Sequence, residues 1–323
     1  MPRFPVRPGD AVQRLSVLLA WVAIVIVFGA LQPATFLTVS NFASIFGSQA
    51  VLVMLTLGLL LPLRCGDYDL SVAGTLTLSA MIIGVLNGGD HLEIWLAIVV
   101  ALAMGVTVGL VNGAFVRIFG INPFIVTLGT GTLLLGIVLL ISGDQTFAGI
   151  SPGLVNVVVV DRFLGIPLEF YYALVVCAVI WYLFDFTGTG RRMLFVGSGR
   201  NVARLSGIRV GRVRIGALVG AALLGAVAGI LYAGTSGSAD PTSGASFLLP
   251  AYAAAYLGAT TIAPGRFNPW GAVIAAYFLL TGVTGLAILG VETWVQDVFY
   301  GGALVVAVAL SQLVRHRQEQ QFN

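Results

Sequence analysis

Charge is scarce in this sequence, and lysine is absent from it. Charged residues make up 9% of the 323 residues, all sixteen basic residues are arginines, and 58% of the chain is hydrophobic. With a mean hydropathy of +1.01, the chain has too little polar surface to form a water-soluble globule. A Walker A loop is also excluded, because it needs a lysine to hold the terminal phosphates of ATP. If ATP drives this protein, another chain must bind it.

Cysteine and histidine are nearly as rare. Cys65 and Cys177 have neither the spacing of metal ligands nor the pattern of a disulfide framework, and we interpret them as small apolar packing residues. His91 and His316 have no third ligand nearby, so the sequence supports neither a zinc site nor a hydrolase triad. We therefore expect no enzyme activity, no metal and no cofactor in this chain. Although the pI is about 9.1, membrane topology accounts for the arginines, and we expect no nucleic-acid partner.

Long apolar runs make up most of the sequence. They cover approximately residues 15–31, 43–63, 75–86, 94–116, 124–141, 170–186, 215–233, 247–262, 270–289 and 294–313. Runs of this length predict an all-α, polytopic integral membrane protein with about ten transmembrane helices in one domain, residues 1–323. The alternative for the first run is a signal peptide cleaved near Ala30 or Ala34, but the run is long for one.

The arginines test this map of spans. Ten crossings put both ends of the chain on one side, and fifteen of the sixteen arginines then fall on that side, with Arg162 alone on the other. Because cytoplasmic loops carry an excess of basic residues, we expect both termini in the cytoplasm. The predicted cytoplasmic segments are the tail 1–14, the segment 187–214 and the tail 314–323.

The stretch Arg191–Arg214 carries seven arginines between two of the apolar runs. Inserting them in a bilayer would cost on the order of 20 kcal/mol, so the stretch stays in water. Ser198 or Asn201 is positioned to cap a short helix through Val202–Ser206, which Gly207 would end in a left-handed conformation. One interpretation is a basic loop that only fixes topology. The other is a helix whose apolar side sits in a protein groove.

The run GSGRNVARLSGIRVGRVR resembles the cytoplasmic coupling segment of carbohydrate-type permeases of bacterial ABC importers, which take up ribose, xylose, arabinose, galactose and small polyols. The family pattern is approximately Gly-Gly-Asn-x-x-Ala-Ala-x-x-Ser-Gly-Ile. Ser198 stands where the second glycine is usual, and residues 200–202 depart from the usual acidic positions. The resemblance implies contacts with an ATPase through Gly197, Arg200, Asn201, Ala203, Arg204, Leu205, Ser206, Gly207 and Ile208.

The stretch Gly66–Gly74, GDYDLSVAG, resembles the Gly-Gly-Ile-Asp-Leu-Ser-Val-Gly signature of the same permeases. Asp67 replaces a glycine, Tyr68 an isoleucine and Ala73 the final glycine. Asp69 or Ser71 can cap the following helix, whose dipole favours a carboxylate. The alternative is that a glycine-rich break lets Asp67 or Asp69 face or gate the transport pathway. The run PAYAAAYLGATT, residues 250–261, is a third point of resemblance.

A neutral sugar needs amide and hydroxyl partners together with aromatic faces, and not charges. Our candidates for the pathway are Gln49, Asp67, Asp69, Asn112, Asn122, Thr127, Tyr252, Tyr256 and Gln296. Asn112 can alternatively bridge two helices by a hydrogen bond. Glycines four residues apart, at 105, 109 and 113 and at 225 and 229, indicate close helix packing, either within one bundle or at a dimer seam.

The resemblance implies a pair of permease subunits, alike or different, in the bacterial cytoplasmic (inner) membrane. It also implies two cytoplasmic ABC ATPase modules and an extracytoplasmic sugar-binding protein as partners, with membrane lipid around the spans. The implied function is import of a monosaccharide, ribose- or xylose-like, or of a small polyol. The alternatives are an ABC permease for branched-chain amino acids or nucleosides, and an ion-coupled secondary carrier. A carrier needs buried carboxylates, and Asp297 is the main acid inside a run.

Overall fold

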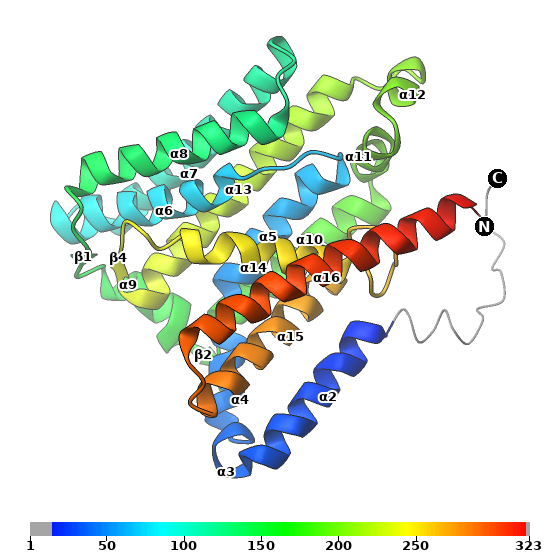
Figure 1. Cartoon of the computed structure of the whole chain (residues 1–323). Helices are drawn as coiled ribbons and strands as arrows, with labels where there is room; N and C mark the ends of the chain where they lie inside the picture. Colours follow the sequence, from blue (N-terminus) through cyan, green and yellow to red (C-terminus); the bar gives the residue numbers. More distant parts are fainter. Residues whose placement is uncertain (1–14, 321–323) are drawn as a thin grey trace.

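The computed structural model describes residues 15–320, with side chains to residue 310, and consists mainly of helices (Figure 1). The amino-terminal half contains α2 (Ser16–Leu31), α3 (Pro33–Phe36), α4 (Val39–Gly47), α5 (Ala50–Arg64), α6 (Ser71–Ile83), α7 (Ile94–Ile118), α8 (Pro123–Ser142) and α9 (Pro152–Val155). The rest contains α10 (Leu168–Phe186), α11 (Gly188–Ser198), α12 (Arg200–Leu205), α13 (Val210–Ser236), α14 (Ala245–Gly258), α15 (Pro269–Ile288) and α16 (Thr293–Gln320). Two π-helical turns, η1 (Gly84–Gly89) and η2 (Asn156–Val160), extend α6 and α9.

Two short antiparallel pairs of strands complete the described chain. β1 (Phe147–Ala148) pairs with β4 (Ser238–Ala239), with Phe147 opposite Ala239. β2 (Arg162–Phe163) pairs with β3 (Ile166–Pro167). The β1–β4 pair lies at the opposite end of the bundle from α12 (Figure 1). The molecule therefore has one end built from loops and short strands and another that carries the arginine-rich segment.

Each of the ten apolar runs corresponds to a helix, so the prediction of an all-α, multi-span protein is confirmed. Among the described residues, eight helical segments are long and apolar enough to cross a membrane. The first and eighth runs form shorter apolar helices, α2 and α14, of 16 and 14 residues. The position of the two termini relative to the membrane stays a prediction.

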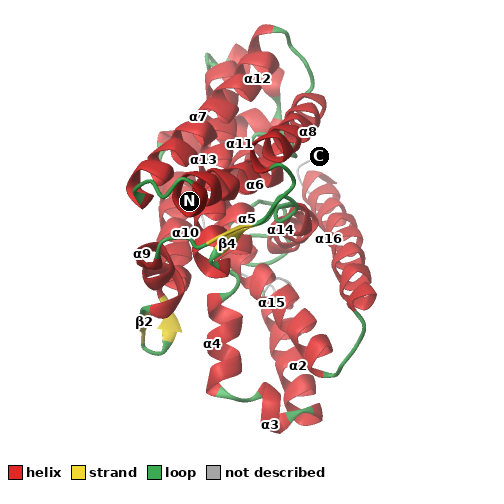
Figure 2. Ribbon diagram, turned by 90° about the vertical axis from the view of Figure 1, so that its left-hand side faces the viewer, coloured by secondary structure: helices red, strands yellow, loops and turns green. Residues whose placement is uncertain are grey.

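Helix α5 occupies the centre of the bundle, between α10 and α14 in Figure 2. Its sequence is apolar on every side, and every residue from Ala50 to Pro62 is buried. A helix without a polar face is stable only where other helices or lipid surround it. Its one hydroxyl inside the apolar stretch, that of Thr56, is satisfied by donating to the Leu52 carbonyl at 2.7 Å. Helices α7 and α8, by contrast, expose many large apolar side chains, as expected for helices that face lipid.

The glycine rows pack helices within this one chain. A Cβ placed on Gly109 of α7 would collide with the backbone of Val219 in α13 and approach the Leu218 carbonyl oxygen to 2.9 Å. A Cβ on Gly229 of α13 would collide with the Leu76 carbonyl of α6. The spacing thus lets backbones approach closely, as small residues do in membranes. Of the two interpretations, packing within one bundle is the one observed.

Candidate functional site

The polar centre of the molecule is the helix break, the segment Cys65–Leu70 between α5 and α6. Its second residue is Gly66, whose φ of +73° lies in the left-handed region that glycine adopts without strain. The next residue, Asp67, donates its backbone N–H to the Pro62 carbonyl at 3.0 Å. The side chains of Asp67 and Asp69 are 1% and 0% exposed. Two carboxylates are therefore buried where the chain turns from one helix into the next.

Asp67 is held by two arginines of the arginine-rich segment. Arg200 of α12 places Nη2 at 2.5 Å from Asp67 Oδ1 and also donates to the Gly66 carbonyl at 3.0 Å. Arg214 of α13 donates from Nε to Oδ2 at 2.7 Å and from Nη2 to Oδ1 at 3.0 Å. This fork-to-fork geometry is the strong form of a charge-assisted hydrogen bond. The arrangement ties α12 and the start of α13 to the helix break.

Asp69 faces the other way and caps α6. Its Oδ1 accepts from the Ser71 backbone N–H at 3.0 Å and from the Ser71 hydroxyl at 2.6 Å. Burial raises the pKa of the Asp69 carboxyl to about 6, against the lowering effect of the Ser71 hydrogen bonds. Asp69 thus accepts the first backbone N–H of α6, in line with the expected capping, although the cap position itself is Leu70 and Ser71 is the first helical residue.

Tyrosines of α14 complete the surroundings of the break. The Tyr252 hydroxyl accepts from the Asp69 N–H at 3.1 Å and donates to the Asp69 carbonyl at 3.0 Å. The Tyr256 hydroxyl donates to that of Tyr68 at 2.9 Å, and the rings of Tyr68 and Tyr252 stack with their centroids 6.4 Å apart. These contacts fix the irregular backbone of the break against α14.

Asn112 of α7 joins three helices in the same network. Its Nδ2 donates to the Ser71 hydroxyl of α6 at 2.9 Å, and its Oδ1 accepts from the Thr130 hydroxyl of α8 at 2.7 Å. On α8, the Thr127 hydroxyl accepts from the Leu70 N–H at 3.0 Å. Asn112 is fully buried, so both amide groups need these partners. The geometry supports the interpretation of Asn112 as a bridge between helices.

We expect Asn112→Leu to lower the free energy of unfolding by about 1–3 kcal/mol, because the buried Ser71 hydroxyl and the half-buried Thr130 hydroxyl each lose a partner. The measurement is the thermal unfolding midpoint of the purified protein in detergent. Thr107→Val, on the same helix, is the control, because its exposed hydroxyl bonds only to the Ala103 carbonyl of its own helix. Equal midpoints for the two variants would contradict the bridging role.

A pocket of about 360 Å³ opens at the break, beside the ion pairs. It is lined by Gly66, Asp67, Tyr68, Gly120, Ile121, Asn122, Pro123, Arg200 and Arg214. Asn122 also caps α8 by accepting from the Phe124 N–H at 3.0 Å. An aromatic face, an amide and charged hydrogen-bonding groups thus surround one cavity. The Tyr68 ring and the Asn122 amide are groups that suit a neutral sugar, whereas the charges of Asp67, Arg200 and Arg214 are compensated within their own ion pairs.

Seven of the nine candidate pathway residues lie in or around the helix break, and two do not. Gln49 precedes Ala50 at the far end of α5 and donates only to the Ser48 hydroxyl, at 3.4 Å. Gln296 lies in the first turn of α16 and is not among the residues that line the pocket at the break. Both were selected by residue type alone. Tyr68, Thr130 and Arg214 belong to the site but were not among the candidates, although Tyr68 and Arg214 lie inside the two stretches that resemble the family.

The predicted short helix is present as α12, although its caps differ from those expected. Its amino-terminal cap is Gly199, with no side-chain hydrogen bond, and the Ser198 hydroxyl donates to the Leu194 carbonyl instead. Asn201 lies within the first turn and caps nothing. Gly207 has a φ of +79°, so the predicted left-handed stop is confirmed.

Within the coupling residues, one side of α12 is buried and the other is free. Ala203 is fully buried, whereas Val202 and Leu205 are 62% and 89% exposed. Helix α11, which was not predicted from the sequence, packs closely on the end of α5, since a Cβ on Gly197 would collide with the Arg64 carbonyl. The Thr187 cap, which accepts from the Gly190 N–H at 3.2 Å, was a signal for this helix.

Comparison with known proteins places this chain in a family. Residues 41–308 match the family described as the permease component of the branched-chain amino acid transport system. The D-allose transport system permease protein AlsC of Escherichia coli K12 is 32% identical over 291 residues, 90% of this chain and 89% of the relative. No solved structure matches the chain.

Two further relatives are permease proteins of autoinducer 2 import systems. LsrD of Salmonella paratyphi B is 32% identical over 260 residues, 79% of this chain and 78% of the relative. LsrC of Salmonella typhi is 31% identical over 294 residues, 91% of this chain and 83% of the relative. The resemblance drawn from the coupling segment and the helix break is therefore confirmed. This chain belongs to the family of permease components typified by the branched-chain amino acid transport system.

Proposed function

We propose that this protein is the membrane-spanning permease subunit of an ATP-powered importer that brings a monosaccharide or small polyol across the bacterial inner membrane. Its relatives are named for D-allose transport and autoinducer 2 import, and the match covers most of each chain. The pocket at the helix break offers aromatic, amide and hydrogen-bonding groups suited to a sugar. The chain is a transport subunit and not an enzyme, so a partner chain must hydrolyse the ATP.

The partner ATPase would dock on α12. The exposed Val202 and Leu205 form an apolar face on a helix of six residues that is surrounded by arginines. An exposed apolar face of this kind marks a protein contact. A second permease subunit and an extracytoplasmic sugar-binding protein complete the proposed assembly, with both termini and α12 in the cytoplasm.

The single observation that carries the mechanism is the bond from Arg200 to Asp67. A force on α12 would move Arg200, and with it the carboxylate of Asp67 at 2.5 Å. The helix break is in turn bonded to α14 through Tyr252 and to α8 through Thr127. The network offers a continuous route from the ATPase contact to the helices around the pocket. Closure of the ATPase pair would therefore switch access to the pathway by displacing the break.

An ion-coupled secondary carrier is the main alternative from another class. Such a carrier needs a titrating carboxylate inside its spans. Asp297, the acid inside the last run, is exposed on α16. A permease for branched-chain amino acids or nucleosides is the alternative within the family. It would differ in the solute that its binding protein delivers.

Reconstitution tests the proposal. Proteoliposomes containing the protein alone should show no ATP-driven uptake of labelled D-allose or related monosaccharides. Adding a cognate ATPase and a sugar-binding protein should produce uptake that depends on ATP. Uptake by the protein alone, driven by a proton or sodium gradient, would favour the carrier. ATP-driven uptake of leucine but not of any sugar would favour the amino-acid permease.

Gly207→Val tests the role of α12. No heavy atom lies within 4 Å of a Cβ placed on Gly207, so the change strains only the left-handed backbone. About 1–2 kcal/mol of such strain should disturb the end of α12 and lower ATP-driven uptake roughly tenfold, while ATP hydrolysis persists. Gly290→Val is the matched control, because Gly290 has a φ of +73° and equally open space in the turn before α16. The proposal fails if both variants transport equally well.

A further inference from the structure

Five arginines surround the connection between α12 and α13, and none of them forms an ion pair with a carboxylate of the described side chains. They are Arg117 of α7, Arg192 of α11, Arg204 of α12, and Arg209 and Arg212 at the start of α13. The ion pairs among the described side chains use Arg64, Arg200 and Arg214 instead. Unpaired positive charges gathered at one place attract a negatively charged ligand.

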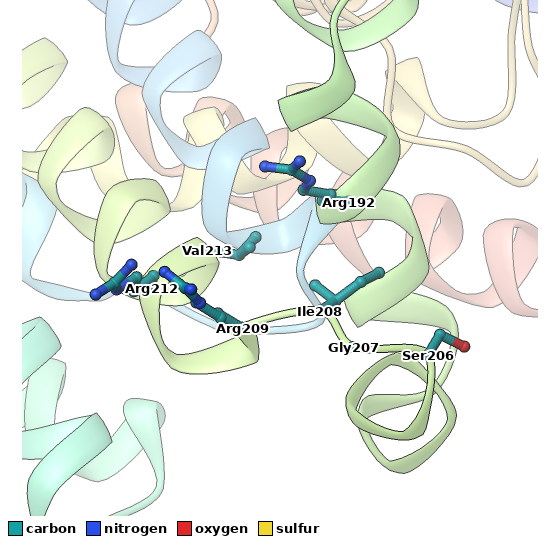
Figure 3. Close-up of a pocket in the computed structure, with 7 residues that line it drawn as sticks. All are labelled: Arg192, Ser206, Gly207, Ile208, Arg209, Arg212 and Val213. Carbon is teal, nitrogen blue, oxygen red and sulfur yellow. The ribbon is translucent and has the colours of Figure 1, made fainter.

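Two adjoining cavities lie between these arginines. One, of about 520 Å³, is lined by Arg192, Arg209 and Arg212 together with residues 206–208 and Val213 (Figure 3). The other, of about 420 Å³, is lined by Arg117, Arg204, Arg209 and Arg212 with Ile208 and residues 210–211. Arg209 and Arg212 belong to both cavities, so the two form one arginine pocket. It is large enough for a phosphate-bearing group.

The second cavity lies at the level where the membrane spans end, because Arg117, which lines it, is at the end of α7. It lies in the last turn of α7, four residues beyond Gly113, and continues the row of residues that faces α13. A Cβ placed on Gly211 would lie 3.1 Å from both Cγ and Cδ of Arg117, so the arginine stem rests on the first turn of α13. Both helices are candidate membrane spans. The guanidinium group is therefore presented at the membrane–water boundary.

The last turns of α7 also carry large apolar side chains. Phe115, Ile118 and Phe119 are 43%, 73% and 66% exposed. The rings of Phe115 and Phe119 stack with their centroids 5.4 Å apart. Exposed aromatic and aliphatic groups beside an arginine, at the end of a span, suit the boundary between lipid headgroups and acyl chains. The acyl chains of a lipid would pack against these apolar side chains, next to the positive charge of Arg117.

We propose that the arginine pocket binds the phosphate headgroup of an anionic phospholipid, whose acyl chains run along the end of α7. Basic pockets between transmembrane helices recognise such headgroups. An acidic protein surface would bind equally well to Arg192 and Arg204, but it would not account for Arg117, which belongs to a span with exposed phenylalanines. The pocket shares Arg204 and residues 206–208 with the proposed ATPase contact, whereas Arg117 lies outside that contact, so the test below is built on Arg117.

Native mass spectrometry of the purified full chain tests the lipid site. The protein in mild detergent is titrated with phosphatidylglycerol or with phosphatidylcholine of the same acyl chains. We expect preferential retention of phosphatidylglycerol, reduced about fivefold by Arg117→Gln, since one basic residue contributes roughly 1 kcal/mol near an anionic surface. Gly211→Val should act in the same direction, because it displaces the Arg117 stem without removing the charge. Arg162→Gln, at the strand β2, is the control and should leave retention unchanged.

Other results would overturn the proposal. Equal retention of the two lipids, or equal loss with Arg162→Gln, would mean that the arginines act only through topology. Displacement of phosphatidylglycerol by millimolar inorganic phosphate or glycerol phosphate would identify a soluble anion as the ligand. Unchanged lipid retention in Arg117→Gln, combined with loss of ATPase assembly, would assign the pocket to the docking surface for the partner chain.

Discussion

Asp67→Ala is expected to reduce ATP-driven sugar uptake to background and to destabilise the protein by about 3–5 kcal/mol. The large effect follows from burial. Asp67 is 1% exposed and compensates two arginines, of which Arg214 is itself only 14% exposed in its side chain. Removing one partner of a buried ion pair leaves an uncompensated charge inside the protein. Uptake in proteoliposomes and the thermal unfolding midpoint measure the two consequences.

A double variant separates the loss of stability from the loss of coupling between ATP hydrolysis and uptake. In Asp67→Ala/Arg214→Leu the more deeply buried of the two arginine charges is gone, and the remaining charge of Arg200, whose side chain is 44% exposed, reaches water. Replacement of a buried ion pair by apolar groups is often neutral for stability. We therefore expect the double variant to recover its unfolding midpoint but not its uptake. Recovery of uptake together with stability would show that Asp67 only supports the fold.

The arginines of α12 provide a matched comparison for the same mechanism. Arg200 and Arg204 lie one turn apart, but only Arg200 contacts Asp67. Because the Arg200 side chain is 44% exposed and Arg214 still holds Asp67, Arg200→Gln should change stability by less than about 1 kcal/mol. Its uptake should nevertheless fall much further than that of Arg204→Gln. Equal uptake in the two variants would contradict transmission through Arg200.

The sequence predicts the architecture well, because the signals for it are local. Runs of apolar residues, glycines at spacing four and the left-handed stop at Gly207 each concern neighbouring residues, and each is found in the structure. The cap of α6 by Asp69 is also local, since the donor is Ser71, two residues away. Helix α11 was not predicted, because Arg191 and Arg192 precede its buried residues, Met193 and Val196, and make the segment resemble a basic loop.

The candidate site is only partly predictable, because its bonds join distant segments. Asp67 meets Arg200 and Arg214 across 133 and 147 residues, and no sequence spacing indicates that pairing. Both Asp67 and Arg200 stand where the family pattern has other residue types, so from the sequence each was interpreted as a separate departure from that pattern. In the structure they compensate each other. Gln49 and Gln296 show the opposite error, since a suitable side chain in an apolar run says nothing about which helices face it.

The second large effect concerns the contact between α7 and α13. Gly109→Val should nearly abolish the accumulation of folded protein in the membrane, because its Cβ would collide with the Val219 backbone and approach the Leu218 carbonyl. Overpacking a close contact typically costs about 1–3 kcal/mol when side chains can shift. Here the obstacle is backbone in a partner helix, so the two helices must separate along the seam that places Arg117 and Arg214.

Gly136→Val on α8 is the matched control for this seam. Gly136 lies within a membrane span of comparable hydropathy, and no heavy atom lies within 4 Å of a Cβ placed on it. It should accumulate normally and give a single symmetric peak in size-exclusion chromatography, whereas Gly109→Val should aggregate. If both variants accumulate equally, close approach of α7 and α13 is not required for folding. The position of the arginine-rich segment relative to the helix break would then need another cause.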